Sequence, residues 1–126
     1  MMLRGIFLAI LSATVLMAGS IEFLNTIPRS NDKPVLVVVE RDGCPWCRKM
    51  KNETLQDKMV VQDLKNYFVV IMDQERWNRL GFEKVQSVPT MFFLDNEKRV
   101  LSKVVGFWDA RDFRVDIRNA NSKLQK

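Results

Sequence analysis

The feature that most constrains the fold is a Cys-Pro-Trp-Cys sequence placed directly after a run of apolar residues. Residues 34–40, PVLVVVE, contain five consecutive apolar residues that are mostly β-branched. Such a run is typical of a strand that is buried on both faces in the middle of a parallel sheet. The short turn RDG follows at residues 41–43, and CPWC begins at residue 44. The pattern therefore predicts a strand, a turn and a helix whose first turn carries both cysteines.

The rest of the chain alternates predicted helices and strands, which favours one α/β domain. Further strands are predicted at 68–73, 90–94 and 100–105, and helices at 44–56, 58–67 and 110–124. Asp57 and Asp109 are candidate caps, and residues 74–87 are a helix or an irregular connection. The order predicts a mixed central sheet with helices on both faces. Residues 21–33 are too few for a full first strand and helix.

Residues 1–20 differ from the rest of the chain. A short basic start is followed by an apolar stretch over residues 5–18 and by the small residues Gly19 and Ser20. This is typical of a secretory signal peptide with a small-residue cleavage site. The alternative is an uncleaved membrane anchor, because the uncharged stretch just reaches the length that spans a bilayer. Either way, we expect residues 21–126 to form one domain in the periplasm or another exported compartment, where disulfides persist.

The charge composition argues against nucleic-acid binding. The chain has 20 basic and 15 acidic residues, a formal net charge of +5. A nucleic-acid-binding protein would show a basic stripe with interleaved aromatic residues, whereas the basic cluster here is only Arg48, Lys49 and Lys51. The chain has no histidine, which removes the commonest base at neutral pH and the commonest zinc ligand.

Three roles remain for the cysteine pair. A structural metal site needs four ligands, so only a site shared between chains or completed from outside would be left. A structural disulfide would enclose two residues, and closing so small a loop removes little entropy from the unfolded chain. Thiol–disulfide exchange fits the local physics. We expect no metal and no cofactor other than the redox-active Cys44–Cys47 disulfide itself.

The predicted helix start gives the two cysteines different roles. Cys44 occupies the N-cap and Pro45 the first helical position, where the missing proline N–H costs nothing. The backbone N–H groups of Trp46 and Cys47 then point toward the Cys44 sulfur, and the helix dipole favours its anion. Such surroundings lower a thiol pKa from about 8.5 to roughly 3.5–7.5. The sequence thus predicts Cys44 as the nucleophile and Cys47 as the resolving thiol.

The spacing of two motifs resembles a known family. CPWC after a buried strand, with Val88-Pro89-Thr90 before a strand hairpin, resembles the thioredoxin superfamily over about residues 34–120. Residues 53–73 are similar to the exported, thioredoxin-related branch of that family. The resemblance implies a thioredoxin-like fold for residues 21–126, with Pro89 in cis and packed opposite the cysteines.

The resemblance also implies a set of substrate-binding residues. The backbone at Val88 would pair with a substrate strand beside Cys44, and Pro45 and Pro89 would border the same contact. The Val88-Pro89 pair alone would be a proline that begins a strand, but the CPWC sequence about 45 residues upstream favours the substrate-binding interpretation. Trp46 is either a substrate-contacting ring, because such rings are common at interfaces, or a ring packed against the domain's own surface.

One departure from the family's pattern concerns the proton acceptor. Thioredoxins carry a buried acid six residues before the first cysteine, and this chain has Val38 there. Glu40 is the nearest acid on the predicted strand, so it is the candidate proton acceptor for the resolving thiol. The two residues between the cysteines also differ from the family's pattern, since thioredoxins have Gly-Pro and this chain has Pro45-Trp46.

Together these features predict an exported thiol:disulfide oxidoreductase that acts on protein disulfides. The resemblance favours a reductase supplied by a membrane electron donor, whereas a stabilised Cys44 thiolate favours an oxidase that uses a membrane acceptor. We take the reductase as the prediction and expect a monomer that binds no nucleic acid. The alternative is a non-catalytic thioredoxin-like module that binds partner or unfolded chains, because a fold does not fix a function.

Overall fold

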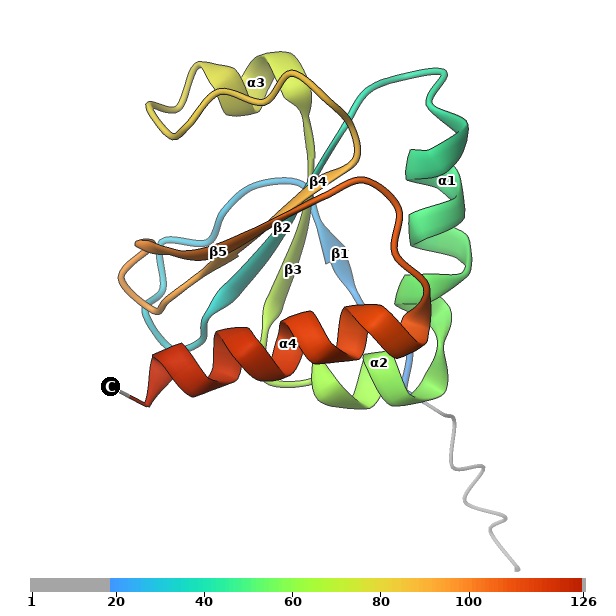
Figure 1. The fold of residues 1–126 in the computed structure, drawn as a ribbon. Coiled ribbons are helices and arrows are strands. Elements are labelled where there is room, and N and C mark those ends of the chain that lie inside the picture. Colours follow the sequence, from blue (N-terminus) through green and yellow to red (C-terminus); the bar gives the residue numbers. More distant parts are fainter. Residues whose placement is uncertain (1–18, 126) are drawn as a thin grey trace, which may run out of the picture.

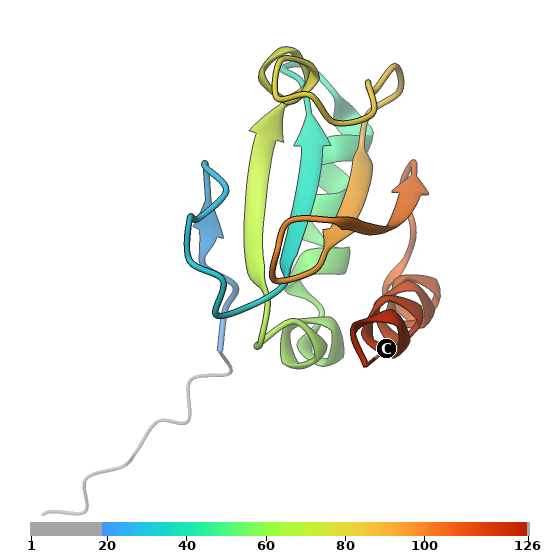
Figure 2. The same ribbon diagram turned by 90° about the vertical axis from the view of Figure 1, so that its left-hand side faces the viewer.

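A computed structural model of the protein describes residues 19–125 and contains one five-stranded sheet. The strands lie in the order β1-β3-β2-β4-β5 (Figures 1 and 2). Their bounds are Phe23–Leu24 for β1, Val35–Glu40 for β2, Phe68–Asp73 for β3, Thr90–Leu94 for β4 and Val100–Val105 for β5. β3 runs parallel to β1 and β2, whereas β4 runs antiparallel to β2 and β5. The predicted mixed sheet is confirmed.

β2 lies at the centre of the sheet because it is apolar on both faces. Residues 35–39 are all fully buried. Leu36 and Val38 point into one core layer, and the alternate valines point into the other. Burying one such side chain stabilises the fold by about 1.5–3 kcal/mol relative to leaving it exposed, so this run is far more favourable at the centre than at an edge. β2 ends at Glu40, and the following turn leads to the cysteines.

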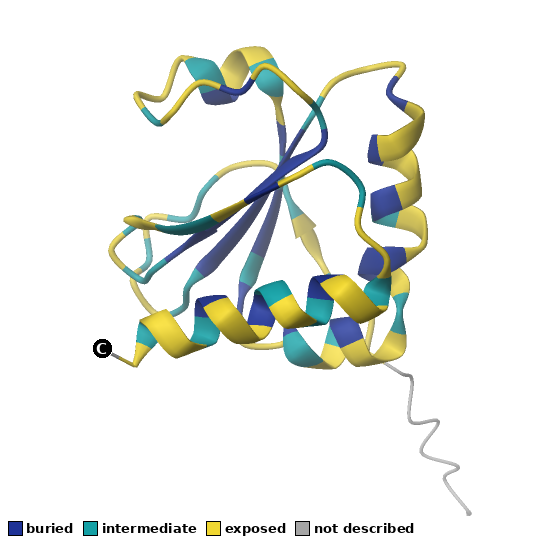
Figure 3. Cartoon of the chain, viewed as in Figure 1, coloured by how far each residue is buried: buried dark blue, intermediate teal, exposed yellow. Residues whose placement is uncertain are grey.

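The described helices cover the two faces unequally (Figures 1 and 3). They are α1 Pro45–Asn52, α2 Lys58–Asp63, α3 Gln74–Asn78 and α4 Ala110–Leu124, with a 3-10 turn, η1, at Thr54–Gln56. α1, α2 and α4 pack on one core layer through buried residues such as Met50, Val60 and Phe113. α3 packs on the other layer through Trp77, whose ring stacks on Phe92 with centroids 4.4 Å apart. Helices on both faces are therefore confirmed, with α3 the smaller cover.

Two helix starts agree with the predicted caps, and one predicted helix is interrupted. Asp57 and Asp109 accept hydrogen bonds from first-turn N–H groups of α2 and α4. The continuous helix predicted for residues 44–56 is wrong in one respect. The chain leaves the helix at Glu53, with φ −110° and ψ −69°, and resumes as η1. The active-site helix is therefore shorter than its sequence pattern indicates.

The N-terminal part of the domain is reduced, in agreement with the sequence. β1 has two residues, which pair with β3. Residues 25–34, between β1 and β2, contain no helix. The predicted signal peptide or anchor, residues 1–20, lies outside the described residues except for its last two. Within residues 19–125, no helix has both the length and the apolar character needed to cross a bilayer.

Candidate active site

The turn after β2 places Cys44 at the start of α1. Gly43 has a φ of +73°, a conformation that glycine adopts without the steric penalty of a side chain. Cys44 follows with extended backbone angles, φ −95° and ψ 105°, and is the N-cap residue of α1. Pro45 begins the first helical turn, where its missing N–H leaves no intrahelical hydrogen bond unmade. The helix start predicted from the sequence is therefore the one observed.

The two cysteines form a disulfide across the first turn of α1. Their Cα atoms are 5.3 Å apart. The backbone N–H of Cys47 points at the Cys44 sulfur, with 3.1 Å between N and Sγ. Cys44 is 9% exposed and Cys47 is 1% exposed. Cys44 is therefore the more exposed of the two cysteines.

The connection that precedes β4 lies opposite the cysteines. The Val88–Pro89 peptide bond is cis, and the Val88 carbonyl oxygen lies 3.8 Å from Cys44 Sγ. The Thr90 hydroxyl donates a 2.7 Å hydrogen bond to the Ser87 carbonyl oxygen, which holds this connection at the start of β4. The fold thus brings Val88 and Pro89 next to a sulfur that is 44 residues away in sequence.

Trp46 lies on the outer side of the site. Its side chain is 56% exposed, and its ring centroid is 5.7 Å from that of Phe107. Lys49 Nζ lies over both rings. The interpretation as a ring packed on the domain's own surface is therefore partly confirmed, because the ring contacts Phe107 and stays more than half exposed. The substrate-contacting role of Trp46 stays a prediction. The sequence indicates Lys49 only as a member of the basic cluster, and it gives no role to Phe107, an aromatic residue two positions after the end of β5.

Glu40, the candidate proton acceptor, is held by a lysine of α1. Lys51 Nζ lies 2.7 Å from Glu40 Oε2, and the side chains are 27% and 22% exposed, respectively. Glu40 follows Val38 by two positions, so the alternation of the strand directs both side chains to the face that α1 covers. Lys51 follows Cys47 by one helical turn, which places the ion pair on the same side of α1 as the buried sulfur.

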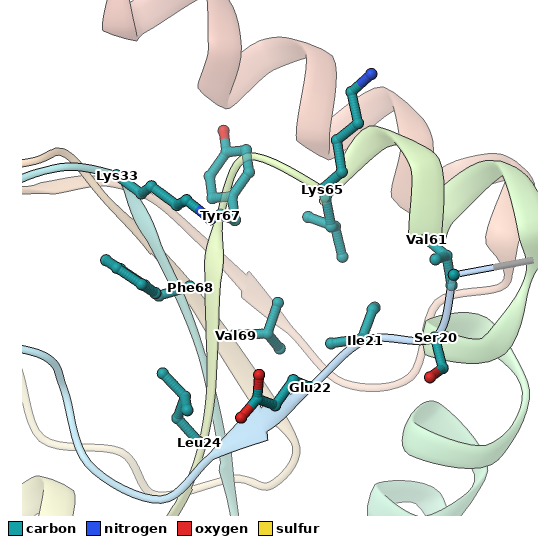
Figure 4. A pocket seen from close by; sticks show the side chains of 12 residues that line it. Ser20, Ile21, Glu22, Leu24, Lys33, Val61, Lys65, Tyr67, Phe68 and Val69 are labelled. Carbon is teal, nitrogen blue, oxygen red and sulfur yellow. The ribbon is translucent and has the colours of Figure 1, made fainter.

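One cavity and a tyrosine with a raised pKa lie away from the cysteines. A cavity of about 320 Å³ is bordered by Ile21, Leu24 and the start of β3 (Figure 4). Because β2 and β3 are parallel, it lies at the end of the sheet opposite the cysteines. Burial raises the pKa of Tyr67, which borders this cavity, to about 12. Within residues 19–125, no three His, Cys, Asp or Glu side chains are grouped to hold a metal ion.

Comparisons with known proteins agree with this geometry. Residues 24–120 match the family described as "Thioredoxin-like domain". The chain is 25% identical over 89 residues to the thiol:disulfide interchange protein DsbD of Campylobacter jejuni strain RM1221. That match covers 67% of this chain and 16% of the relative, so the chain spans about one sixth of the relative's length.

Two solved structures share the fold. A thioredoxin from Thermus thermophilus superposes with a TM-score of 0.65 at 21% identity, over 84% of this chain and 91% of that one. A structure described as DsbH oxidoreductase superposes with a TM-score of 0.64 at 18% identity, over 91% of this chain and 92% of that one.

Proposed function

Since the chain belongs to the thioredoxin-like domain family, we propose that it reduces protein disulfides in an exported compartment. Its Cys44–Cys47 disulfide at the start of α1 makes it a thiol:disulfide oxidoreductase of that family. The observation that carries the thiol–disulfide chemistry, without its direction, is the Cys47 N–H directed at Cys44 Sγ. This hydrogen bond and the positive end of α1 favour the Cys44 thiolate, which is the form that attacks disulfides.

The reaction proceeds in two exchanges. The Cys44 thiolate attacks one sulfur of the substrate disulfide, a Cys44–substrate bond forms, and the substrate S–S bond breaks. Its electron pair leaves on the second substrate sulfur, which takes up a proton. Cys47 then gives its proton to Glu40 and attacks Cys44 Sγ, which releases the first substrate sulfur as a thiolate. Two electrons have passed from the cysteine pair to the substrate.

The surroundings of the sulfur bind the substrate in this proposal. The backbone of Val88, beside the cis bond to Pro89, pairs with an extended substrate segment next to Cys44. Pro45 borders the same contact because it follows Cys44 directly. The exposed ring of Trp46 packs on apolar substrate residues, as amphipathic rings commonly do at interfaces.

The cellular setting is part of the proposal. Residues 1–20 direct the chain out of the cytoplasm, and residues 21–126 work there as a monomer. Each turnover leaves the Cys44–Cys47 disulfide, so a donor must return two electrons, and in this proposal the donor is membrane-bound. The DsbD relative is named for thiol:disulfide interchange, which supports this kind of exchange. A stabilised Cys44 thiolate works against strong reducing power, so the reduction potential has to be measured.

The full chain can be tested for thiolate chemistry and for exchange. Alkylation of the reduced protein across a pH series should give a Cys44 pKa within roughly 3.5–7.5, below the ordinary value of about 8.5. The reduced protein should also cleave insulin disulfides, and a Cys44→Ala variant should not. A pKa near the ordinary value together with no insulin cleavage would refute the oxidoreductase and favour a non-catalytic binding module.

A Cys47→Ala variant tests the resolving step. Without Cys47, the mixed disulfide at Cys44 should persist, and adducts that disappear on reduction should be visible in the exported fraction. The matched control is Cys44→Ala combined with Cys47→Ala, which has no sulfur to form adducts. Absence of adducts in the single variant would contradict attack by Cys44.

The reduction potential of the pair decides the direction of electron flow. A value near that of thioredoxin, about −270 mV, supports the reductase. A value near that of DsbA, about −120 mV, would instead make the protein an oxidase that requires a membrane acceptor. Equilibration of the full chain with glutathione buffers, followed by quantification of both forms, provides this measurement.

A further inference from the structure

Lys49 lies in α1, two residues after Cys47, in an aromatic setting that restricts its position. Its Nζ is 4.8 Å from the centre of the Phe107 ring and 5.3 Å from the centre of the Trp46 ring. A lysine ammonium within about 6 Å of a ring face is attracted by the ring's quadrupole. The flexible lysine side chain is therefore held at one edge of the active-site helix.

The connection after β5 supports the second ring. In Figure 1 this connection runs beside α1 on its way to α4. The Gly106 N–H donates a 2.8 Å hydrogen bond to the Pro89 carbonyl oxygen. The Thr54 hydroxyl donates a 2.6 Å hydrogen bond to the Trp108 carbonyl oxygen. Phe107, between these two anchors, is thus held against both the active-site helix and the connection opposite the cysteines.

Lys49 and Arg48 are the two basic side chains of α1 that are not closely paired with a carboxylate of a described residue. Within residues 19–125, Lys49 has one ion-pair partner, Glu53 at 3.9 Å, and the two side chains are 44% and 62% exposed. An exposed pair at this distance contributes little and leaves the ammonium available. Lys51 is neutralised by Glu40 at 2.7 Å. Arg48 is exposed and makes no ion pair with a described residue.

We propose that Lys49 is a specificity-determining residue that favours substrate disulfides with an acidic side chain near the attacked cysteine. The inference rests on the proposed function and specifies its substrate class. The exposed ring of Trp46 lies on this side of the site, directly after Cys44 and Pro45, so a polypeptide joined to Cys44 gains apolar contact there. Its neighbouring side chains then reach Lys49. A carboxylate gains a charge-assisted hydrogen bond, whereas a basic side chain meets like charge from Lys49 and Arg48.

Three disulfide peptides that differ only in the residue next to the cysteine test this preference. That residue is Asp, Asn or Lys. The reduced full chain should exchange about two- to fivefold faster with the Asp peptide than with the Asn peptide, as expected for a partly exposed charge pair. The Lys peptide should be the slowest. The spread should shrink when salt is raised to about 0.5 M, because mobile ions screen exposed charges.

Substitutions of Lys49 test whether this lysine causes the preference for the Asp peptide. Lys49→Gln should remove it, Lys49→Glu should reverse it and Lys49→Arg should preserve it. Lys65→Gln is the matched control, because Lys65 is an exposed lysine that borders the cavity at the opposite end of the sheet. If Lys49→Gln does not fold, the salt dependence of the unaltered chain and the behaviour of the Lys49→Arg variant decide whether Lys49 causes the preference.

The outcomes separate the two proposals. Equal rates for all three peptides, or a Lys49→Gln variant that keeps the preference, would overturn the role of Lys49 and leave the oxidoreductase intact. No exchange with the Asn peptide or either of the others would refute the proposed function, and the charge preference with it.

Discussion

Two helices of this protein begin in the same way and serve different purposes. Cys44 caps α1 and receives the N–H of Cys47, with 3.1 Å between N and Sγ. Asp109 caps α4 and receives the N–H of Asp112 at 2.9 Å. In both cases a side-chain acceptor meets the positive end of a helix. Both helices also pack on the same core layer.

The difference lies in the chemistry of the capping atom. An aspartate cap has no redox chemistry, so the hydrogen bond at Asp109 only stabilises its helix. The sulfur of Cys44 exists as a thiolate, a thiol or half of a disulfide. The same hydrogen bond therefore favours the thiolate of Cys44 over its thiol and its disulfide. The comparison teaches that a helix start becomes structural or reactive according to the residue that caps it.

Each helix also carries an ion pair, in the last turn of α1 and in the second turn of α4. Lys51 of α1 binds Glu40 of β2, and Arg114 of α4 binds Asp63 of α2, both at 2.7 Å. The first pair lies one helical turn beyond Cys47, whereas the second joins two helices. If the proposed function holds, only the first pair takes part in proton transfer.

The largest effect is expected from changing the cap of α1 to serine. Cys44→Ser keeps a capping oxygen and removes the nucleophile, so insulin reduction should fall to the uncatalysed background. Denaturation under reducing conditions should still find this variant about 1 kcal/mol more stable than Cys44→Ala, because serine is a good cap and alanine is not. Asp109→Ser should keep full activity. Insulin cleavage by Cys44→Ser would show that the Cys44 sulfur is not the nucleophile, and the contrast between the two caps would be wrong.

A smaller effect is expected at the ion pair of α1. Glu40→Gln removes the proposed proton acceptor, so the mixed disulfide at Cys44 should be resolved about tenfold more slowly, less than the effect of a fully positioned base. Quenched-flow trapping of the mixed disulfide across a pH series provides the measurement. Asp63→Asn breaks the corresponding pair of α4 and should leave this rate unchanged. An unchanged rate in Glu40→Gln would exclude Glu40 as the acceptor.

The cap of α4 should affect stability and not chemistry. Asp109→Ala removes the acceptor for the Asp112 N–H, so urea denaturation should show a loss of about 0.5–2 kcal/mol. Insulin reduction should stay within about twofold of the unaltered chain, because a structural cap holds no reacting atom. A large loss of activity in a folded Asp109→Ala variant would show that this cap also positions the active site.

The smallest effect is expected from Asp116, farther along α4. Burial and the neighbouring charge of Asp112 raise the pKa of the Asp116 carboxyl in the folded protein. A raised pKa means that the folded state binds the proton more tightly, so the contribution to stability is present at low pH and is lost as pH rises. Asp116→Asn should therefore be slightly more stable at pH 7, by less than about 1 kcal/mol because the carboxyl is only partly buried and solvent still screens it. Denaturation should show the gain shrinking as pH falls toward the ordinary value of 3.8; a gain that is independent of pH would contradict this cause.

The buried strands and the helix starts could be predicted because they depend on neighbouring residues. The apolar run at residues 35–39 determines a central strand. Cys44-Pro45, Asp57 and Asp109 mark where helices begin, since a capping side chain reaches only the next three N–H groups. The interruption at Glu53 could not be predicted, because the sequence there has no proline or glycine to end a helix.

The contacts around the sulfur were only partly predictable. Glu40 was identified as an acid near the end of a strand, but its pairing with Lys51 depends on how α1 lies on β2. In the sequence, Lys49 can be recognised only as one member of a basic cluster. Its position between Trp46 and Phe107 requires the β5–α4 connection to pass beside α1.

The sequence by itself determined which atoms carry the proposed chemistry, because Cys44, Pro45 and Cys47 act within one helical turn. Only the tertiary structure decided what surrounds them. The Val88 carbonyl oxygen reaches Cys44 from 44 residues away, and Phe107 arrives from a third part of the chain. The physical reason is the separation in sequence between the residues that interact. Caps and apolar alternation are local interactions, whereas the environment of the sulfur is set by the packing of α1 against strands and connections distant in sequence.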